Sequence, residues 1–318
     1  MTNDAGDLGE FEIIDRLRSK FGSNKFVVLG SGDDAAILDT PDGDVVIGTD
    51  MAIEGVHFRT DWSSSIQIGQ RIAAQNFADI ATMGAVPVAI TIALAVPPTT
   101  HITWLEGFMV GIEAECKPLN VEVVGGDMSR SDRIMISITA LGHRRGLPAV
   151  TRAEAQPGDV VAVAGRLGYA AAGLACIQRG HRSPREAVDA FLTPTPPYAA
   201  GPAAAKAGAT AMIDISDGLL ADVRHIANAS GVTIDLDANA IAPDEFLSNL
   251  ARNMAEDAMD WVRNGGEDHA LVAVFPPGKR LPAAFRPIGR VLDRDVLGVP
   301  VLIGGAQAPK IEGHDHFR

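Results

Sequence analysis

The sequence predicts an α/β protein, of the α+β type, built from two domains. The chain has 318 residues, of which 47% are hydrophobic, so it is long enough for a full core in each of two domains. Segments with helical spacing of apolar residues alternate with short runs rich in β-branched residues. A stretch containing two prolines, residues 144–158, separates the halves. We therefore predict an N-terminal domain over residues 1–148 and a C-terminal domain over residues 149–318.

Composition limits the classes of partner. The formal net charge of −13 argues against a nucleic-acid-binding surface, which needs basic side chains to neutralise phosphates. An acidic enzyme can still take a phosphorylated substrate if metal ions supply positive charge locally. The longest apolar run, residues 85–98, is interrupted by Pro87 and is too short to span a bilayer. The two cysteines lack metal-ligand spacing and the N-terminal stretch is acidic, so we expect a cytoplasmic protein without a membrane partner.

Periodicity predicts the elements in order. In the N-terminal half we expect helices over residues 11–21, 66–83 and 102–119, and strands over residues 88–96, 121–124 and 134–142. In the C-terminal half we expect strands over residues 160–164, 211–214 and 270–274, helices over residues 168–178 and 219–230, and β segments near Val291 and Val299. A proline-rich stretch, residues 193–197, predicts a rigid connector.

Carboxylates are concentrated in residues 30–58. Asp33 and Asp34 precede an apolar run, residues 41–44 predict a tight turn, and a second strand over residues 45–47 ends before Asp50. Such a hairpin would return Asp50 to the neighbourhood of Asp33 and Asp34, where a divalent metal would relieve the repulsion between carboxylates. Turn chemistry alone explains Asp and Gly here equally well. The G-x-G-x-x-A match at Gly30 is rejected as a dinucleotide fingerprint because a strand, not a helix, follows it.

The same theme of an acid at an element end recurs along the chain. Asp79 lies near the end of a predicted helix, Asp127 follows Gly125-Gly126, and an acid–hydroxyl–acid series follows the strand at residues 211–214. Glu267 and Asp268 precede another strand. Each has an ordinary explanation: a solvated acid for Asp79, a turn for the glycine pair, and helix capping by a polar side chain after the strand.

Six such segments nevertheless favour a common cause. Carboxylate oxygens without cysteine or paired histidine ligands indicate magnesium rather than zinc. Several magnesium ions beside a Gly-Gly pair indicate a nucleoside triphosphate and phosphoryl transfer. The chain has no Walker sequence and no protein-kinase signature set, so the nucleotide must be held in another way.

The ordered motifs resemble the thiamine-monophosphate kinase family, part of the superfamily of aminoimidazole ribonucleotide synthetase. They are GDDAA, TDM…GVHF, NFADIATMGA, GGD, TRAEAQPGD, MIDISDGL and GGEDHAL, and they extend from about Gly9 to Phe317. The resemblance implies an N-terminal α/β domain whose sheet pairs with a second subunit in a central barrel. It also implies a C-terminal α/β sandwich that closes over an ATP cleft.

The resemblance further implies a reaction and a set of site residues. The reaction is direct phosphorylation of thiamine monophosphate by ATP, the co-substrate, with several Mg²⁺ ions; a need for K⁺ is left open. The implied metal ligands are Asp34, Gly48, Thr49, Asp50, Asp79, Asp127, Asp214 and Asp217. The implied ATP contacts are Gly126, Asp127, Arg152, Ser216 and Met109. The implied substrate contacts are His57, Glu267, His314 and Phe317, and the implied catalytic residues are Asp127, Asp217 and Asp50.

Some positions depart from the family pattern or allow another interpretation. Met109 stands where the family often has a tyrosine, and His314 where an aromatic residue commonly precedes DHF. From the residues alone, His57 is better explained as a hydrogen-bonded hairpin or core histidine. Two other functions remain alternatives: an ATP-dependent ligase acting on a purine-pathway ribonucleotide, and a non-catalytic ATP-binding relative.

Overall fold

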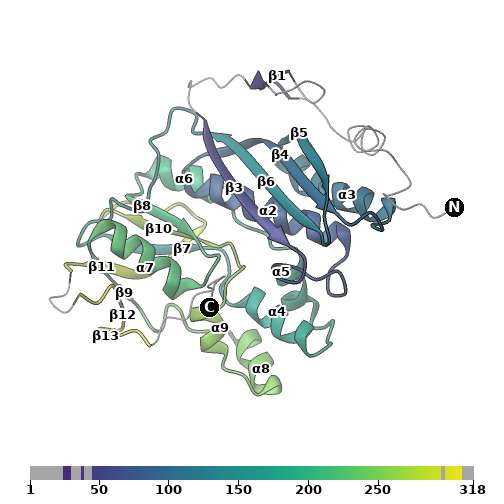
Figure 1. The fold of residues 1–318 in the computed structure, drawn as a ribbon. Coiled ribbons are helices and arrows are strands. Elements are labelled where there is room, and N and C mark those ends of the chain that lie inside the picture. The colour runs from purple at the N-terminus through teal and green to yellow at the C-terminus, as the bar shows by residue number, and fades with distance from the viewer. Residues whose placement is uncertain (1–23, 30–36, 39–44, 295–297, 310–318) are drawn as a thin grey trace. The chain divides into compact units, whose positions relative to one another are not determined.

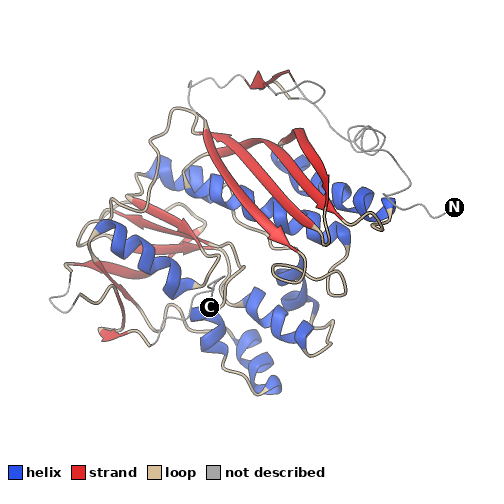
Figure 2. Ribbon diagram, in the orientation of Figure 1, coloured by secondary structure: helices blue, strands red, loops and turns tan. Residues whose placement is uncertain are grey.

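The computed structural model describes residues 24–29, 37–38, 45–294 and 298–309. The predicted helix at residues 11–21, the acids Asp33 and Asp34, and the C-terminal His314 and Phe317 lie outside these ranges. The chain divides into two compact units, Met1–Ile80 with Val86–Gly146, and Ala81–Ala85 with Leu147–Arg318. Both units combine helices with a sheet (Figure 2), as the predicted fold class requires. Within the described ranges, no helix is both long and apolar enough to cross a membrane.

The first unit contains a four-stranded sheet with the strand order β3-β6-β4-β5 (Figure 1). Its strands are β3 (Val46–Ile53), β4 (Val86–Val96), β5 (Glu122–Arg130) and β6 (Met135–His143). β6 pairs antiparallel with both β3 and β4, whereas β4 and β5 are parallel and are connected through helix α3 (Ile102–Leu119). Helix α2 (Ser65–Thr82) and α3 cover one face of this sheet. Two short strands, β1 (Val27–Leu29) and β2 (Ile37–Leu38), form a separate antiparallel pair.

The core of this unit lies between the sheet and its two helices. Ile68, Ile72 and Ile80 are buried on α2, as the helical spacing predicts. On β6, Ile136 and Ile138 are fully buried, while the alternate residues are only half-buried. The period of two along a strand therefore places the apolar residues against the helices and leaves the other face of the sheet more open.

Glycines allow α2 and α3 to pack closely. A Cβ added at Gly111 would overlap the main-chain carbonyl oxygen of Ile66, and one added at Gly69 would overlap that of Phe108. By contrast, a Cβ added at Gly107, one turn earlier on α3, would meet the Ser65 hydroxyl, which can rotate away. Gly111 is therefore required by the helix contact and Gly107 is not.

We expect Gly111→Ala to lower the free energy of unfolding by about 2 kcal/mol, because the helices must separate to admit a methyl group. Gly107→Ala is the matched control and should be neutral or stabilising by up to about 1 kcal/mol, since alanine is the better helix former. Urea unfolding of both variants measures the difference. Equal effects of the two substitutions would contradict the close helix contact.

Three predictions for this unit are wrong. The strand predicted over residues 45–47 does not end at Gly48, because β3 pairs with β6 continuously from Val46 to Ile53. The predicted hairpin is absent from the described pairings, in which β2 pairs with β1 and β3 with β6. Gly125-Gly126-Asp127 is not a turn after a strand but the middle of β5, which pairs with β4 and accommodates Val124 as a bulge. Pairing with distant strands outweighed the local turn signals in each case.

The second unit contains a seven-stranded sheet with the order β13-β12-β9-β11-β7-β10-β8. Its strands are β7 (Val160–Ala164), β8 (Ala211–Asp214), β9 (Thr233–Leu236), β10 (Leu271–Phe275), β11 (Phe285–Leu292), β12 (Val301–Ile303) and β13 (Ala306–Gln307). Its helices are α4 (Tyr169–Gln178), α5 (Arg185–Leu192), α6 (Ala200–Ala207), α7 (Leu219–Ser230), α8 (Glu245–Met254) and α9 (Ala258–Asn264). The residues predicted as a connector, 193–197, lie between α5 and α6.

Both faces of this sheet are covered. Val161 and Val163 of β7 belong to a core shared with α4, α7, α8 and α9, whereas Ala162 and Ala164 belong to a second core shared with α6. Burial on both faces explains why β7, β8 and β10 are apolar throughout rather than alternating. A sheet with helices on both faces is the arrangement that the predicted α/β sandwich requires.

Helices α5, α6, α8 and α9 were missed from the sequence. Two of them carry capping signals that could have revealed them: the Asp244 side chain accepts a hydrogen bond from the Leu247 N–H at the start of α8, and Asp257 accepts from the Met259 N–H at the start of α9. Aspartate before a helix is a strong N-cap. Asp and Asn are frequent between the strands of this region, and both residues favour turns and loops, which masks the two helices.

Candidate functional site

In the first unit, Asp50 on β3 and Asp79 on α2 lie on the side of the sheet where this strand and this helix are adjacent. Gly48 and Asp50 lie on the half-buried side of β3, alternating with the exposed Ile47, Thr49 and Met51. A Cβ added at Gly48 would lie 4.0 Å from the Cβ of Asp79 on α2. Asp79 therefore lies beside Gly48, on the same side of β3 as Asp50. This arrangement brings two of the predicted metal ligands to one side of the sheet.

Thr49 points the other way. Its hydroxyl lies 2.9 Å from the Thr139 hydroxyl, its register partner on β6. Because adjacent side chains of a strand project to opposite faces, the side chains of Thr49 and Asp50 cannot bind one ion together. For an ion beside Asp50, Thr49 can offer only its main-chain carbonyl.

Asp127 is exposed on β5, which is an edge strand of the sheet. The neighbouring glycines differ in what they face. A Cβ added at Gly126 would overlap the Ile92 carbonyl oxygen of β4, whereas one added at Gly125 would meet nothing within 4 Å. Gly126 is therefore needed for strand pairing, and Gly125 leaves open space beside Asp127.

We expect Gly126→Ala to lower the free energy of unfolding by about 2 kcal/mol, because a methyl group there must push β5 away from β4. Gly125→Ala should leave stability within about 0.5 kcal/mol of the parent. If the open space beside Gly125 receives a phosphate, Gly125→Ala should instead raise the KM for ATP. Thermal unfolding and ATP kinetics of both variants separate these effects, and a well-folded Gly126→Ala would contradict the packing argument.

His57 and Met109 both lie in the first unit. The His57 Nδ1 accepts a hydrogen bond of 3.0 Å from the Ile53 N–H, so the neutral ring carries its proton on Nε2. The hairpin-histidine interpretation therefore describes one contact of this ring correctly. Met109 is 4% exposed and packs in the core side of α3.

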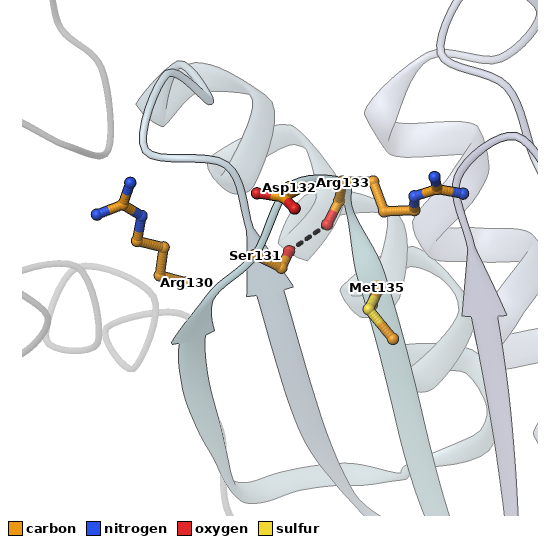
Figure 3. A pocket seen from close by; sticks show the side chains of 5 residues that line it. All are labelled: Arg130, Ser131, Asp132, Arg133 and Met135. Atoms are coloured by element: carbon orange, nitrogen blue, oxygen red, sulfur yellow. Dashed lines mark hydrogen bonds between the residues drawn. The ribbon is translucent and has the colours of Figure 1, made fainter.

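A shallow hollow of about 500 Å³ lies at the turn between β5 and β6. Figure 3 shows its lining: the Ser131 hydroxyl donates to the Arg133 carbonyl, and the guanidinium groups of Arg130 and Arg133 point to opposite sides. Asp132 and Met135 complete it. It contains none of the predicted site residues, so this hollow does not coincide with the predicted chemistry.

In the second unit, the loop after β8 carries Asp214, Ser216 and Asp217 to the start of α7. The helix is capped from within, because the buried Asp222 carboxylate accepts hydrogen bonds of 3.1 Å from the N–H groups of both Asp217 and Gly218. The predicted alternative, capping by Ser216 or Asp217, is therefore replaced by Asp222. Burial, followed by repulsion from Asp214 and Asp217, raises the pKa of Asp222 to about 8.

Asp222 was not predicted, although an acid in the first turn of a predicted helix is a signal that could have found it. Its raised pKa also tests whether these residues fit a cation. Asp214 and Asp217 disfavour the ionised form of Asp222, and the three carboxylates provide the hard oxygen donors and the negative charge that a divalent magnesium ion neutralises.

The GGEDH segment is joined to this loop by main-chain hydrogen bonds. The Glu267 N–H donates to the Ser216 carbonyl and the His269 N–H to the Ile215 carbonyl, both at 2.9 Å. Glu267 and His269 adopt positive φ angles of 68° and 47°, which residues other than glycine rarely adopt. A Cβ at Gly266 would overlap the Ser216 carbonyl oxygen, so glycine permits this close approach. Strained backbone that is held this firmly is typical of functional sites.

His269 was not among the predicted site residues, but the structure places it beside two of them. Its side chain is 1% exposed, with Nδ1 3.0 Å from Asp214 Oδ2 and Nε2 3.7 Å from Glu267 Oε2. Burial alone would lower the pKa of His269, but its contacts with the two carboxylates outweigh burial and raise this pKa to about 10. The neighbouring Asp268 is structural: its buried carboxylate accepts from the N–H groups of Gly168 and Ala170 at the start of α4.

Arg152 has an exposed side chain, and its main-chain carbonyl accepts a hydrogen bond of 2.8 Å from the Ser230 hydroxyl of α7. The guanidinium acts electrostatically on α7. After burial, Arg152 and then Arg224 are the main causes that lower the pKa of His225, and Asp217 opposes them. Arg152 therefore lies within electrostatic range of the helix that begins after Asp217.

Within the described ranges, no three His, Cys, Asp or Glu side chains converge closely enough to hold a metal ion. Each unit instead presents its own pair or triad of acids, and Asp34 lies outside the described residues. The predicted site residues of the first unit are thus Gly48, Thr49, Asp50, His57, Asp79, Met109, Gly126 and Asp127. Those of the second unit are Arg152, Asp214, Ser216, Asp217 and Glu267.

The class of protein follows from the two units and their matches to known domain families. Residues 32–143 match the N-terminal domain, and residues 156–297 the C-terminal domain, of AIR synthase related proteins. The chain is 45% identical over 287 residues to the thiamine-monophosphate kinase of Mycobacterium tuberculosis, which covers 90% of this chain and 86% of that one. The chain belongs to the thiamine-monophosphate kinase family.

Solved structures agree with this assignment. The thiamine-monophosphate kinase from Stenotrophomonas maltophilia K279a matches with a TM-score of 0.82 and 33% identity, covering 95% of this chain and 98% of that one. A structure of AaThiL complexed with AMPPCP and TMP matches with a TM-score of 0.79 and 30% identity, covering 97% and 98% of the two chains. The family resemblance and the two-domain fold predicted from the motifs are confirmed.

Proposed function

We propose that this protein transfers the γ-phosphoryl group of ATP to the phosphate of thiamine monophosphate, giving thiamine diphosphate and ADP. The observation that carries the proposal is the match over nearly the whole of both chains to AaThiL complexed with AMPPCP and TMP. The acceptor phosphate is already an anion, so the reaction needs no strong general base. What limits it is the repulsion between two phosphate groups, which bound cations reduce.

The proposed metal ligands are carboxylates from both units. Asp50, Asp79 and Asp127, with Asp34, would serve in the first unit, and Asp214 and Asp217 in the second. When bound, several Mg²⁺ ions would supply the charge neutralisation that phosphoryl transfer requires. The chain's own task would be to hold these carboxylates in place, and the hydrogen bond from the Asp217 N–H to Asp222 supports this role for the loop that carries Asp217. A need for K⁺ is not part of the proposal.

The remaining assignments concern the two substrates. Gly126, Asp127, Arg152, Ser216 and the helix carrying Met109 would contact ATP. His57 and Glu267, with His314 and Phe317, would contact thiamine monophosphate. Residues 1–148 would form the metal-binding and dimerisation domain and residues 149–318 the domain that closes over ATP. The protein would act in the cytoplasm, where its two buried free cysteines would stay reduced.

The test is ATP consumption with thiamine monophosphate, with an aminoimidazole precursor, and with no acceptor. We expect stoichiometric ADP and thiamine diphosphate only with thiamine monophosphate. Consumption only with the ribonucleotide would favour the ligase alternative, and ATP binding without any turnover would favour the non-catalytic one. Detection of a phosphorylated protein intermediate on the reaction path would contradict direct transfer.

A homodimer through the open face of the N-terminal sheet belongs to the same proposal. Ile47 and Met51 of β3 are 65% and 53% exposed and lie on one face of the strand, an apolar surface that a partner subunit would cover. Residues 88–96 offer no free sheet edge to a partner subunit, because β4 lies between β5 and β6.

We expect sedimentation at micromolar concentration to give a dimer, and Ile47→Asp to give a folded monomer, because a charge would then have to be buried in the interface. The exposed Val110→Asp on α3 is the control, which should stay dimeric. A monomeric parent protein, with and without ATP, would contradict the proposal.

A further inference from the structure

His269 lies between two acids that come from different segments. Asp214 ends β8, and Glu267 belongs to the segment that leads into β10. The two ring nitrogens of His269 face one acid each, at 3.0 Å for Asp214 and 3.7 Å for Glu267. The ring is 1% exposed and Asp214 is 6% exposed, so water screens their interaction little, whereas the Glu267 side chain is 38% exposed.

The backbone leaves this ring little freedom. The N–H of His269 is bonded to Ile215, the residue directly after Asp214, and the N–H of Glu267 is bonded to Ser216. The positive φ angles at Glu267 and His269 persist because these bonds hold both residues. These main-chain bonds hold the segment that carries His269 and Glu267 against the residues that follow Asp214. A buried histidine needed only for packing would not require an acid on each side.

We propose that His269 is a positioning residue that connects the metal ligand Asp214 to the acceptor-binding residue Glu267, so that binding at one favours binding at the other. The inference rests on the proposed function for the roles of these two acids. A metal ion that orders Asp214 also orders His269 and thereby Glu267. The acceptor then binds a site that has already lost its conformational entropy, so its binding is more favourable.

The test measures the coupling through the protein alone. Thiamine is the acceptor probe because it lacks the phosphate and so cannot contact the metal itself. Calorimetry gives the Mg²⁺ affinity of the protein loaded with AMPPCP, with and without thiamine. In the parent protein we expect thiamine to tighten Mg²⁺ binding about fivefold, the lower end of usual coupling between sites.

Two substitutions each remove one of the two contacts that the His269 ring makes with an acid. An Asn amide overlies the His Nδ1 position, so His269→Asn keeps a partner for Asp214 and loses the contact with Glu267. His269→Gln places its amide near the Nε2 position and does the reverse. We expect His269→Asn to retain Mg²⁺ affinity without thiamine, His269→Gln to weaken it, and both to reduce the coupling to less than about twofold. Asn also accepts the positive φ at this position better than other side chains.

His143→Asn is the matched control, because His143 is the other histidine buried to a similar extent, at 2% exposed, in the described part of the chain. It should keep the fivefold coupling. Coupling that persists in His269→Asn, or that is absent from the parent protein, overturns the proposal. Thiamine monophosphate phosphorylation by the parent protein is measured separately, and its absence would overturn the proposed function instead.

Discussion

Asp127→Asn is expected to slow phosphoryl transfer about a hundredfold or more, the usual effect of losing one charge contact in the transition state. The same substitution should change the free energy of unfolding by less than about 0.5 kcal/mol, because Asp127 is exposed and Asn matches it in size. The large effect is expected because, in the proposed function, this carboxylate serves both a metal ion and the nucleotide phosphates. The measurement is thiamine diphosphate formation as a function of Mg²⁺ concentration.

Asp132→Asn provides the matched control for this experiment. Asp132 is also an exposed acid of the first unit and lies in the turn after β5, but it is outside the predicted site. Its substitution should leave both the rate and the Mg²⁺ dependence unchanged. The turn explanation of the Gly-Gly-Asp sequence no longer applies, because these residues lie inside a strand. An unaltered rate in Asp127→Asn would therefore remove Asp127 from the site.

Asp217→Asn should separate function from stability in the second unit. We expect a loss of transfer rate of about a hundredfold or more, since the substitution removes a proposed metal ligand. Without metal, however, the variant should be as stable as the parent or more stable by up to about 1 kcal/mol. The reason is that Asp217 contributes to the repulsion that raises the pKa of the buried Asp222.

The sign of the pH dependence follows from the same carboxyl group. The pKa of Asp222 is raised from 3.8 to about 8 on folding, so its contribution to stability is present at low pH and is lost as the pH rises through 8. Asp217→Asn should reduce that loss. Denaturation between pH 4 and 9 without Mg²⁺ measures it.

A second arm adds Mg²⁺ and AMPPCP. The parent protein should gain about 2.7 kcal/mol of stability when ligand is present at a hundred times its dissociation constant, and Asp217→Asn should gain much less. Asp293→Asn, an exposed acid of the same unit, is the control and should behave as the parent. A variant with the parent rate and the parent response to Mg²⁺ would exclude Asp217 as a ligand.

The main-chain elements were largely predictable. The helix over residues 102–119 and the strand over residues 160–164 match α3 and β7 residue for residue. Apolar periodicity is a local property that survives in the fold because the buried face of an element is decided by its own sequence. The same holds for the loop and helix after Asp214, where a strand, a polar loop and an amphipathic helix follow in order.

The positions of Asp50 and Asp127 were less predictable. Glycine and aspartate are poor strand formers and good turn formers, so the sequences around both residues predicted strand ends. β3 instead continues because β6, about ninety residues later in the chain, pairs with all eight of its residues. Such pairing is absent from any local window, and it decides which face of the strand Thr49 and Asp50 occupy.

By itself, the sequence determined the fold class, the order of most strands and the set of predicted metal-binding acids, because apolar periodicity and ordered motifs are properties of the chain. Only the tertiary structure decided what each acid does. Asp222 and Asp268 cap helices, and His269 meets Asp214 across a separation of 55 residues. Carboxylates are chemically alike, so their roles depend on which N–H group, imidazole or open space the fold places beside them.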